Sequence, residues 1–552
     1  MRLDLTDRDT VELRCDRVDL DLCKSIPGGK WRTKAQCWEY PASCLLDIRE
    51  AFKGRTATVG PGIKDYLHSQ EIRQSLLDGV KQGVVDLDAH PFLMEHQKKC
   101  VLLAKYFNRF SFFLDTGTGK TITALQIIED KATKFLVVCP KAIIKAAWVE
   151  DAAQFFPEMQ VLPISRNMNK ENYGRLFEKW CRREPPRKAS TLFLKGALEE
   201  MAQVYIINPE SFKLDVKAIS SLGVRGLILD ESTMIKNPDS QITTALTAFA
   251  ETMEYVYILS GKPAPNSSMD YFSQMRMVDP GILGDSYYSF RMRYYLATGY
   301  MQHIWLPKPG AEDDITRRIS KRAFFISKEE CLDLPEKTYL IRSPEMPKAA
   351  MKYYKQMEHE RVLRLEDTTI TAANKLSTLM KLRQITSGFV LDSEGDDTVL
   401  HSAKIQELVD TLDQIGDKQV IIWAQFQAEI RLIEKTLTDM GKTCVTAYGG
   451  TKSVDQSIVD FKDGAAQYII CHPMTLRFGV TLTNCTYVIY YSMSYSYEDY
   501  YQSHDRVYRK GQSKPCTFIF LLMQGTIDEV IYEVIQNKGT ASDIIEEMIR
   551  KG

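Results

Sequence analysis

The 552-residue sequence lacks the features that define several large classes of protein. Its 71 Lys and Arg residues are balanced by 72 Asp and Glu residues, so the formal net charge is only −1. This balance excludes a generally basic coat for nucleic acid, although a local basic cleft depends on the arrangement of charges and remains compatible with it. The 12 Cys residues form no C-x-x-C pair, which argues against a disulfide scaffold and fits a reducing compartment.

Long apolar runs, internal repeats and low-complexity tracts are also missing. No run approaches the about 18 apolar residues that span a bilayer, and the charged start MRLDLTDRDT is unlike a signal peptide. We therefore expect a cytoplasmic protein, or a nuclear one if the source is eukaryotic. The absence of histone-reading or nuclear-localisation segments favours a bacterial or viral source.

The composition that is present, 44% hydrophobic and 26% charged, is that of a globular protein. At roughly 150 residues per domain the length predicts about three to four domains. Short segments broken by turns predict a small α+β domain over 1–88. Apolar strands alternating with helices predict parallel α/β units over 89–280 and 401–552. The stretch 281–400 is predicted to be a helical insertion. The fold class is therefore α/β, with expected strands at 111–114, 134–139, 204–208, 227–230, 255–260, 419–423, 443–447, 467–471, 487–491 and 517–521.

A glycine-rich loop follows the first expected strand of the first α/β unit. The sequence Asp115-Thr116-Gly117-Thr118-Gly119-Lys120-Thr121 leads directly into a helical stretch. Glycines allow a tight loop whose backbone N–H groups face an anion at a helix N-terminus. Lys120 would then reach the β- and γ-phosphates of a nucleotide, and the Thr121 hydroxyl would bind Mg²⁺. The strict phosphate-loop pattern has Gly where this chain has Leu114, and the alternative is a chance glycine-rich turn.

Two adjacent carboxylates follow a second apolar strand, in Leu227-Ile228-Leu229-Asp230-Glu231. The carboxyl edge of a parallel sheet is where nucleotides bind in open α/β folds. We expect Asp230 to hold the Mg²⁺ shell and Glu231 to orient and deprotonate the attacking water. By itself such a pair is more often a solvated turn, and the glycine-rich loop is what favours the functional interpretation.

Taken in order, these segments resemble the motifs of superfamily-two helicase-type motors, specifically the Swi/Snf-type family of double-stranded DNA translocases. The resemblance covers 92–540 and rests on DTGTGKT, LILDESTMIKN, ILSGKPAPN, VIIWAQF, AYGGTK, FGVTLT and QSHDRVYRKGQ. It implies two RecA-like lobes, ATP and Mg²⁺ as cofactors, and double-stranded DNA as partner. The chain departs from the family at Lys262, where Thr is usual, and at Ser232-Thr233, where Ser-His is commoner. The third motif, ILSGKPAPN, is thought to couple ATP hydrolysis to lobe movement in this family. Lys262 lies in this motif and therefore puts the efficiency of that coupling in question.

The last motif supplies two cations. Guanidinium groups stabilise the charge on a departing phosphate without losing their proton. Arg506 and Arg509, three residues apart, are predicted to share one face of a helix. They lie in the second α/β unit, so they would complete the site only when the two lobes close. A solvated basic face is the alternative.

Weaker assignments follow from the same resemblance. Gln97 matches the glutamine that reads adenine, and Lys141 matches a lysine that holds DNA phosphates. Gln425 and Thr481 match DNA-contacting residues of the second lobe. Each could instead be an ordinary surface or loop polar group. The predicted nucleotide-binding residues are Gln97, Thr116, Gly117, Thr118, Gly119, Lys120 and Thr121.

The segment 19–41 interleaves basic residues with aromatic ones, as a reader of DNA forks or junctions needs. It also resembles the HARP domain of annealing helicases, in I-P-G-x-x-W followed by W-x-Y-P. The predicted DNA contacts here are Lys30, Trp31, Arg32, Lys34 and Trp38. The alternative is a small structural domain with the tryptophans in its core. The spacing of Cys15, Cys23, Cys37 and Cys44 fits no common zinc-ligand pattern.

We therefore expect a DNA-dependent ATPase that translocates on double-stranded DNA and remodels or anneals branched or fork DNA. Two alternatives stay open: a helicase that separates strands of DNA or RNA, and an ATP-switched motor subunit of a larger nucleic-acid assembly. The sequence predicts no membrane partner and does not identify protein partners.

Overall fold

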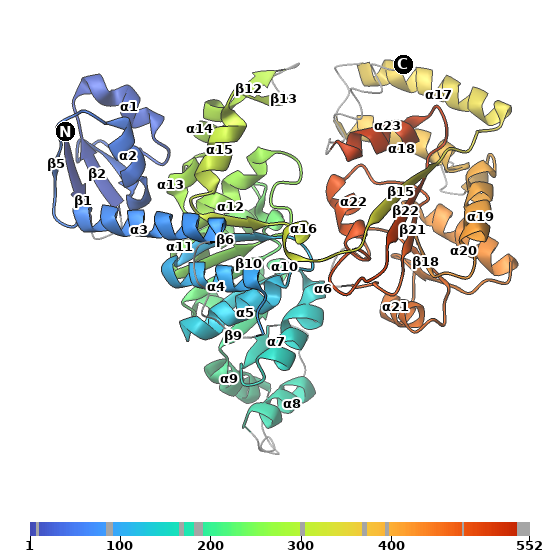
Figure 1. Cartoon of the computed structure of the whole chain (residues 1–552), viewed down its shortest axis with the longest axis horizontal. Coiled ribbons are helices and arrows are strands. Elements are labelled where there is room, and N and C mark those ends of the chain that lie inside the picture. The colour runs from blue at the N-terminus through green and yellow to red at the C-terminus, as the bar shows by residue number, and fades with distance from the viewer. Residues whose placement is uncertain are drawn as a thin grey trace. The chain divides into compact units, whose positions relative to one another are not determined.

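The computed structural model describes residues 1–6, 10–83, 92–164, 170–181, 191–298, 304–366, 372–391, 397–476 and 480–537. The chain forms two compact units, 1–331 and 332–552, which are described separately (Figure 1). Over the part of the chain that is described, no helix is long and apolar enough to cross a membrane.

The amino-terminal part of unit 1 is a small mixed domain. Its five-stranded sheet has the order β3-β4-β2-β1-β5. Figure 1 shows α3 leading from this sheet to the rest of the unit. Buried apolar side chains such as Val11, Leu13 and Ile48 form its own core. The elements are β1 (Arg2–Leu5), β2 (Thr10–Arg14), η1 (Arg17–Asp19), α1 (Leu20–Ser25), β3 (Lys30–Arg32), β4 (Cys37–Pro41), η2 (Ala42–Cys44), α2 (Leu45–Ala51), β5 (Thr58–Val59) and α3 (Ile63–Gln82).

The remainder of unit 1, lobe 1, is built on a parallel sheet of seven strands. Its strands, in spatial order, are β14 (Ala323–Ile326), β6 (Arg109–Leu114), β11 (Tyr255–Leu259), β10 (Gly226–Asp230), β7 (Phe135–Val138), β9 (Val204–Ile207) and β8 (Val161–Pro163). The central strands are buried on both faces, as their continuous apolar runs predict. This confirms the predicted parallel α/β lobe.

Helices cover both faces of the lobe 1 sheet. One face packs Leu227 and Leu229 against residues of α10, α11 and α12, such as Phe212, Leu246 and Met275. The helical elements are α4 (Glu95–Tyr106), α5 (Lys120–Lys131), α6 (Lys141–Ile143), a π-helical turn η3 (Ile144–Val149), α7 (Glu150–Phe155), α8 (Lys170–Cys181), α9 (Thr191–Met201), α10 (Pro209–Ser220), η4 (Ser232–Ile235), α11 (Gln241–Glu251), η5 (Ser268–Asp270), α12 (Tyr271–Val278), α13 (Pro280–Leu283), α14 (Tyr287–Tyr294), α15 (Ala311–Ile319) and α16 (Lys328–Cys331). A separate hairpin joins β12 (Tyr295–Thr298) and β13 (Ile304–Pro307).

The amino-terminal domain is attached to lobe 1 by specific contacts. Asp47 on α2 pairs with Arg318 at 3.6 Å and with Lys321 at 2.8 Å. The Ser43 hydroxyl donates to Asp279 Oδ1 at 2.7 Å. A Cβ added to Gly281 would lie only 2.4 Å from Ser43 Oγ, so the two parts approach each other too closely for a side chain there.

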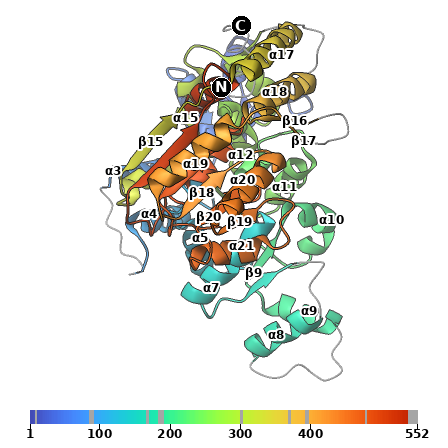
Figure 2. The ribbon, with the colours of Figure 1, turned by 90° about the vertical axis from the view of Figure 1, so that its right-hand side faces the viewer.

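Unit 2, which we call lobe 2, is a second parallel sheet, of six strands. In spatial order these are β15 (Lys337–Arg342), β22 (Cys516–Leu521), β21 (Tyr487–Tyr490), β18 (Val420–Trp423), β20 (Tyr468–Cys471) and β19 (Cys444–Ala447). Val420 and Ile422 face α19 and α20 on one side of the sheet, which is the side seen in Figure 2. Ile421 and Trp423 face α18 and α23 on the other side. Two parallel sheets, each covered by helices, confirm the predicted pair of RecA-like lobes.

The helices of lobe 2 are α17 (Lys348–Glu366), α18 (Ala372–Thr386), α19 (Ala403–Ile415), α20 (Gln427–Asp439), α21 (Val454–Lys462), α22 (Tyr497–His504) and α23 (Ile527–Gln536). A two-stranded ribbon joins β16 (Phe389–Leu391) to β17 (Asp397–Val399).

The stretch 281–400 differs from the helical insertion that the sequence predicts. It contains many helices, but β14 extends the sheet of lobe 1 beside β6, and β15 extends the sheet of lobe 2 beside β22. Both are edge strands. One side of an edge strand is open to solvent, so exposed residues such as Phe325, Leu340 and Ile341 interrupt the buried pattern.

Candidate functional site

Four neighbouring strands of lobe 1 are each followed by a segment that the family resemblance singles out. The glycine-rich loop follows β6, the third-motif loop follows β11, the paired carboxylates follow β10, and Lys141 follows β7. Because these strands are parallel and adjacent, their carboxyl ends lie at one edge of the sheet. This edge is where open α/β folds bind ligands.

The phosphate loop has the backbone that its glycines predict. Gly117 and Gly119 have φ of 78° and 83°, in the left-handed region that favours glycine. Helix α5 begins directly afterwards, at Lys120. The Thr118 hydroxyl donates to the Asp115 carbonyl at 2.7 Å, and Asp115 Oδ1 accepts the Thr116 N–H at 2.9 Å. The loop is therefore braced from within, at a helix N-terminus suited to an anion.

Helix α4 braces the same loop from outside. The imidazole of His96 contacts the Thr118 carbonyl at 2.7 Å. The amide of Gln97 donates to the carbonyls of Thr118 and Gly119 at 3.3 and 3.2 Å, and its oxygen accepts the Met94 N–H. The structure thus gives Gln97 a role in holding the phosphate loop. That it also contacts adenine stays a prediction.

Asp230 is buried at the end of β10. Its Oδ2 accepts the indole N–H of Trp148 at 2.9 Å, and its Oδ1 accepts the Glu231 N–H at 3.0 Å. Burial, and then the charge of Glu231, raises the pKa of Asp230 to about 6, although Lys120 and the Trp148 bond act in the opposite direction. A buried carboxylate with one positive neighbour is a site where a further cation would be stabilising.

Glu231 lies beside the phosphate-loop lysine. Lys120 Nζ is 3.5 Å from Glu231 Oε1, and both side chains are largely buried. Glu231 has φ of 59°, which is unusual for a residue with a side chain. Such a conformation costs about 1–3 kcal/mol, and residues of this kind cluster at functional sites. The structure therefore brings together two residues that lie 111 positions apart in the sequence.

The third-motif loop, 260–266, contacts the phosphate loop. A Cβ added to Gly261 would lie 3.2 Å from Thr116 Cγ2 and 3.4 Å from Lys120 Nζ. Lys262, the departure from the family pattern, is half-buried. Thr121 is half-buried at the start of α5, and Lys141 is exposed at the start of α6.

The two arginines of the last motif are not on a helix, contrary to the prediction. Helix α22 ends at His504, and 505–511 form successive turns. Arg506 is buried; its guanidinium donates to the carbonyls of Gln502 and Val480 at 3.1 and 3.0 Å. Its own carbonyl accepts the Leu482 N–H at 2.8 Å. Arg506 thereby holds the segment next to Thr481, whereas Arg509 is half-buried.

The other second-lobe motif residues, Gln425 and Thr481, lie outside the helices and strands of lobe 2. Gln425 follows β18, and its N–H is bound by Glu429 Oε2 and Ser492 Oγ, both at 2.9 Å. Thr481 is half-buried. Phe478 and Gly479 of the FGVTLT motif, and the end of the resemblance at 538–540, lie outside the described residues.

The predicted DNA contacts of the amino-terminal domain are partly engaged within the protein. Lys30 pairs with Asp285 of lobe 1, and Arg32 pairs with Glu39. Trp31 is 45% exposed and Lys34 is exposed. The half-buried Trp38 packs edge-on against Trp31 and stacks on Tyr40. The four cysteines noted above are free, with Cys15 Sγ 3.2 Å from Cys23 Sγ. Within the described ranges no group of His, Cys, Asp and Glu is arranged to hold a metal.

Sequence reasoning missed three residues that shape these sites: Trp148, Gln274 and Glu429. Trp148 lies in a π-helical turn, a feature that often marks function. Gln274 is buried on α12 and Glu429 on α20. Glu429 is the third residue of α20, but the capping-box pattern also needs a residue such as Ser or Thr at the N-cap, where this chain has Phe426. For the other two, a single Trp or Gln in a helical stretch gives no pattern.

Comparison with known proteins adds to this geometry. The sequence matches the SNF2-related domain over 111–388 and the helicase conserved C-terminal domain over 403–511. It is 23% identical over 471 residues to putative protein p41 of Acyrthosiphon pisum secondary endosymbiont phage 1, covering 80% of this chain and 95% of that protein. It is 22% identical over 561 residues to the SWI/SNF-related matrix-associated actin-dependent regulator of chromatin subfamily A-like protein 1 homolog of Caenorhabditis elegans, covering 98% of this chain and 74% of that protein.

The solved structures that match this chain do so with low sequence identity and low TM-scores. The SWI2/SNF2 ATPase core of Sulfolobus solfataricus in complex with dsDNA is 22% identical, with a TM-score of 0.38, covering 85% of this chain and 96% of that one. The Pyrococcus furiosus Hef helicase domain is 14% identical, with a TM-score of 0.47, covering 79% and 97%.

Proposed function

Because the chain belongs to the SNF2-related family and is a DNA-dependent ATPase of the helicase superfamily, we propose that it translocates on double-stranded DNA and remodels or anneals branched DNA. The observation that carries the motor assignment is the pairing of Lys120 with Glu231 beside a braced phosphate loop. A lysine for phosphate oxygens and a carboxylate for the attacking water are the two groups that phosphoryl transfer to water requires.

The residues of lobe 1 fit ATP and Mg²⁺. The carboxylate of Asp230 and the hydroxyl of Thr121 are the oxygen donors that Mg²⁺ prefers, and burial of Asp230 favours a neighbouring cation. Mg²⁺ would neutralise the charge that develops between the β- and γ-phosphates. Lys120 would bind the phosphates, which releases Glu231 from its ion pair. Glu231 would then accept a proton from the attacking water.

The second lobe would contribute positive charge. Arg506 donates to two backbone carbonyls, so it also holds the local structure around Thr481. We propose Arg506 and Arg509 as the sources of positive charge for the γ-phosphate.

The preference for branched DNA rests on the amino-terminal domain. Its resemblance to the HARP domain, and the exposure of Trp31 and Lys34, support a role in binding DNA bases and phosphates. Its contacts with Asp279, Arg318 and Lys321 support a fixed position on lobe 1. A domain that moves with the motor could present this surface at a constant distance from the translocated duplex.

The motor assignment is tested by ATPase assays at fixed salt with duplex, single-stranded and forked DNA and with RNA. Lys120→Ala and Glu231→Gln should each abolish DNA-stimulated turnover, and normal turnover in either would refute the assignment. Greater stimulation by RNA than by duplex DNA, or displacement of an annealed strand, would favour a strand-separating helicase instead.

The branched-DNA proposal needs a separate experiment. The double variant Trp31→Ala/Lys34→Ala should lose the preference for forked over linear duplex while keeping stimulation by linear duplex. Lys53→Ala, an exposed lysine of the same domain, is the matched control. An unchanged preference in the double variant would contradict the role of this surface.

A further inference from the structure

A buried side-chain amide joins two motif loops of lobe 1. Gln274 lies on α12 and is 0% exposed. Its Oε1 accepts the hydroxyl of Ser232 at 2.6 Å. Its Nε2 donates to the carbonyls of Pro263 and Asp270, at 2.6 and 2.8 Å. Both amide hydrogens and the amide oxygen are therefore used.

One side of this amide reaches the turn that carries Glu231. Ser232 follows Glu231 directly, is itself fully buried, and begins the short helix η4. Glu231 has a strained backbone, so the conformation of its turn must be fixed by the groups around it. Asp230 fixes one end of the turn through the Glu231 N–H. Gln274 fixes the other end through Ser232.

The other side of the amide reaches the third-motif loop, 260–266. Pro263 lies two residues after Gly261, which packs against Thr116 and Lys120 of the phosphate loop. The far end of the loop is also held, by η5 directly before α12, because the Asn266 N–H donates to Asp270 Oδ2 at 3.1 Å. The loop is thus in contact with the phosphate loop and anchored to Gln274.

We infer that Gln274 is a positioning residue for ATP hydrolysis, which ties the turn carrying Glu231 to the third-motif loop. A displacement of either segment would break a buried hydrogen bond unless the other segment moved with it. Leaving a buried partner unsatisfied is costly, so the two segments are expected to move together. This inference rests on the proposed roles of Lys120 and Glu231. It also explains how a loop with Lys262 in place of Thr stays connected to the hydrolytic carboxylate.

Three variants separate the two connections. Ser232→Ala removes only the bond to the Glu231 turn. Gln274→Glu keeps an oxygen for Ser232 but places a second oxygen against the Pro263 and Asp270 carbonyls, so it breaks only the loop connection. Gln274→Leu removes both. Gln126→Leu is the matched control, because Gln126 is equally buried but bonds only within its own helix, to Glu129 and Asp130.

Gln274→Leu is expected to lower DNA-stimulated kcat by about 10- to 100-fold, the range typical for loss of a residue that supports a catalytic group. The KM for ATP should change by less than about twofold, because binding of the phosphates by Lys120 is untouched. Ser232→Ala and Gln274→Glu should each lower kcat. The double variant Ser232→Ala/Gln274→Leu should be no worse than Gln274→Leu, because both changes interrupt one connection.

The inference is overturned if the three variants keep wild-type kcat. It is also overturned if they raise the KM for ATP at unchanged kcat. A lower melting temperature at unchanged kcat, the result expected of a control that merely destabilises the fold, would overturn it too. Should Gln274→Leu fail to fold, Ser232→Ala and Gln274→Glu decide the outcome. Failure of the proposed function itself would be seen separately, as ATPase activity that survives Lys120→Ala.

Discussion

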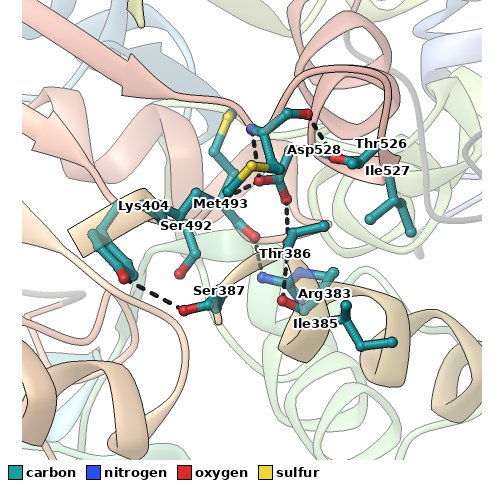
Figure 3. A network of polar contacts seen from close by, with 12 residues as sticks. Arg383, Ile385, Thr386, Ser387, Lys404, Ser492, Met493, Thr526, Ile527 and Asp528 are labelled. Carbon is teal, nitrogen blue, oxygen red and sulfur yellow. Dashed lines mark hydrogen bonds and ion pairs between the residues drawn. The ribbon is translucent and has the colours of Figure 1, made fainter. Parts of the chain in front are cut away.

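Lys404 on α19 forms an ion pair with Asp528 at the start of α23, and both side chains are almost fully buried in lobe 2. Figure 3 shows this pair among polar side chains from several elements. Thr386 at the end of α18 donates its hydroxyl to Asp528 Oδ1 at 3.0 Å, and the Met523 N–H donates to Oδ2 at 3.2 Å. Asp528, on α23, thus links α18, α19 and the loop after β22, near the carboxyl edge of the sheet.

We expect Lys404→Met to destabilise lobe 2 strongly. The change leaves the Asp528 carboxylate buried without its cation, which costs about 3–5 kcal/mol in comparable cases. The measurement is the urea midpoint of the protein, with Lys435→Met on the exposed face of α20 as control. A midpoint equal to that of the control would show that the ion pair does not contribute to stability. Adding Asp528→Asn to Lys404→Met should recover part of the loss, because the uncompensated charge is removed.

Glu429 gives a second prediction, for the loop that carries Gln425. Its carboxylate accepts hydrogen bonds from Ser387, from Ser492 at 2.6 Å, and from the N–H groups of Gln425 and Phe426 at 2.9 and 3.0 Å. Glu429→Gln would turn one acceptor into a donor that faces other donors, at a cost of about 1–3 kcal/mol.

Because Gln425 is a predicted DNA contact, the same variant should weaken duplex binding as well as lower the melting temperature. Binding is measured by fluorescence anisotropy with a labelled duplex, and Glu345→Gln, at an exposed position, is the control. A variant that melts earlier but binds duplex normally would separate the stability of this loop from DNA binding.

The pH dependence of unit 1 should report on Asp314 of α15. Burial would raise the pKa of Asp314, but hydrogen bonds and ion pairs from Arg318, Tyr294 and Arg317 outweigh burial and lower its pKa from 3.8 to about 2. A carboxyl group with a lowered pKa stabilises the fold above its unfolded pKa. This stabilisation is lost as the pH falls from about 4 to about 2. Asp314→Asn should lower the melting temperature at pH 7 and flatten its decline between pH 4 and pH 2.5. A decline as steep as that of the wild type would assign the acid sensitivity to other carboxylates.

The sequence was sufficient to predict strands that are buried on both faces, such as β7 and β10, because their apolar runs are continuous. The sequence was also sufficient to predict a tight glycine loop, which the left-handed Gly117 and Gly119 form. It did not reveal β14 and β15, because edge strands expose part of their side chains. Helices surround these two strands in the sequence, so the pattern of 281–400 predicts a helical insertion there.

The contacts that complete the sites could not be predicted, because they join residues distant in sequence. Gln274 lies 42 positions from Ser232, and the pairing of Lys30 with Asp285 joins two domains. The spacing of Arg506 and Arg509 suggested one helix face, but α22 ends before them. A three-residue spacing alone does not show where a helix stops.

The junction between the amino-terminal domain and lobe 1 gives the last prediction. Gly281 packs so closely that an added Cβ would lie 2.4 Å from Ser43 Oγ and 2.9 Å from Cys44 Sγ, so Gly281→Val should separate α2 and η2 from α13. Hydrogen exchange of residues 42–48 should then accelerate, while exchange of β10 and β11 stays slow. Gly196→Ala, where a Cβ meets open space, is the control.

If fixed docking supports the preference for branched DNA, Gly281→Val should retain ATPase stimulation by linear duplex and lose the additional stimulation by forks. Faster exchange with an unchanged fork preference would show that the domain acts without a fixed position on lobe 1.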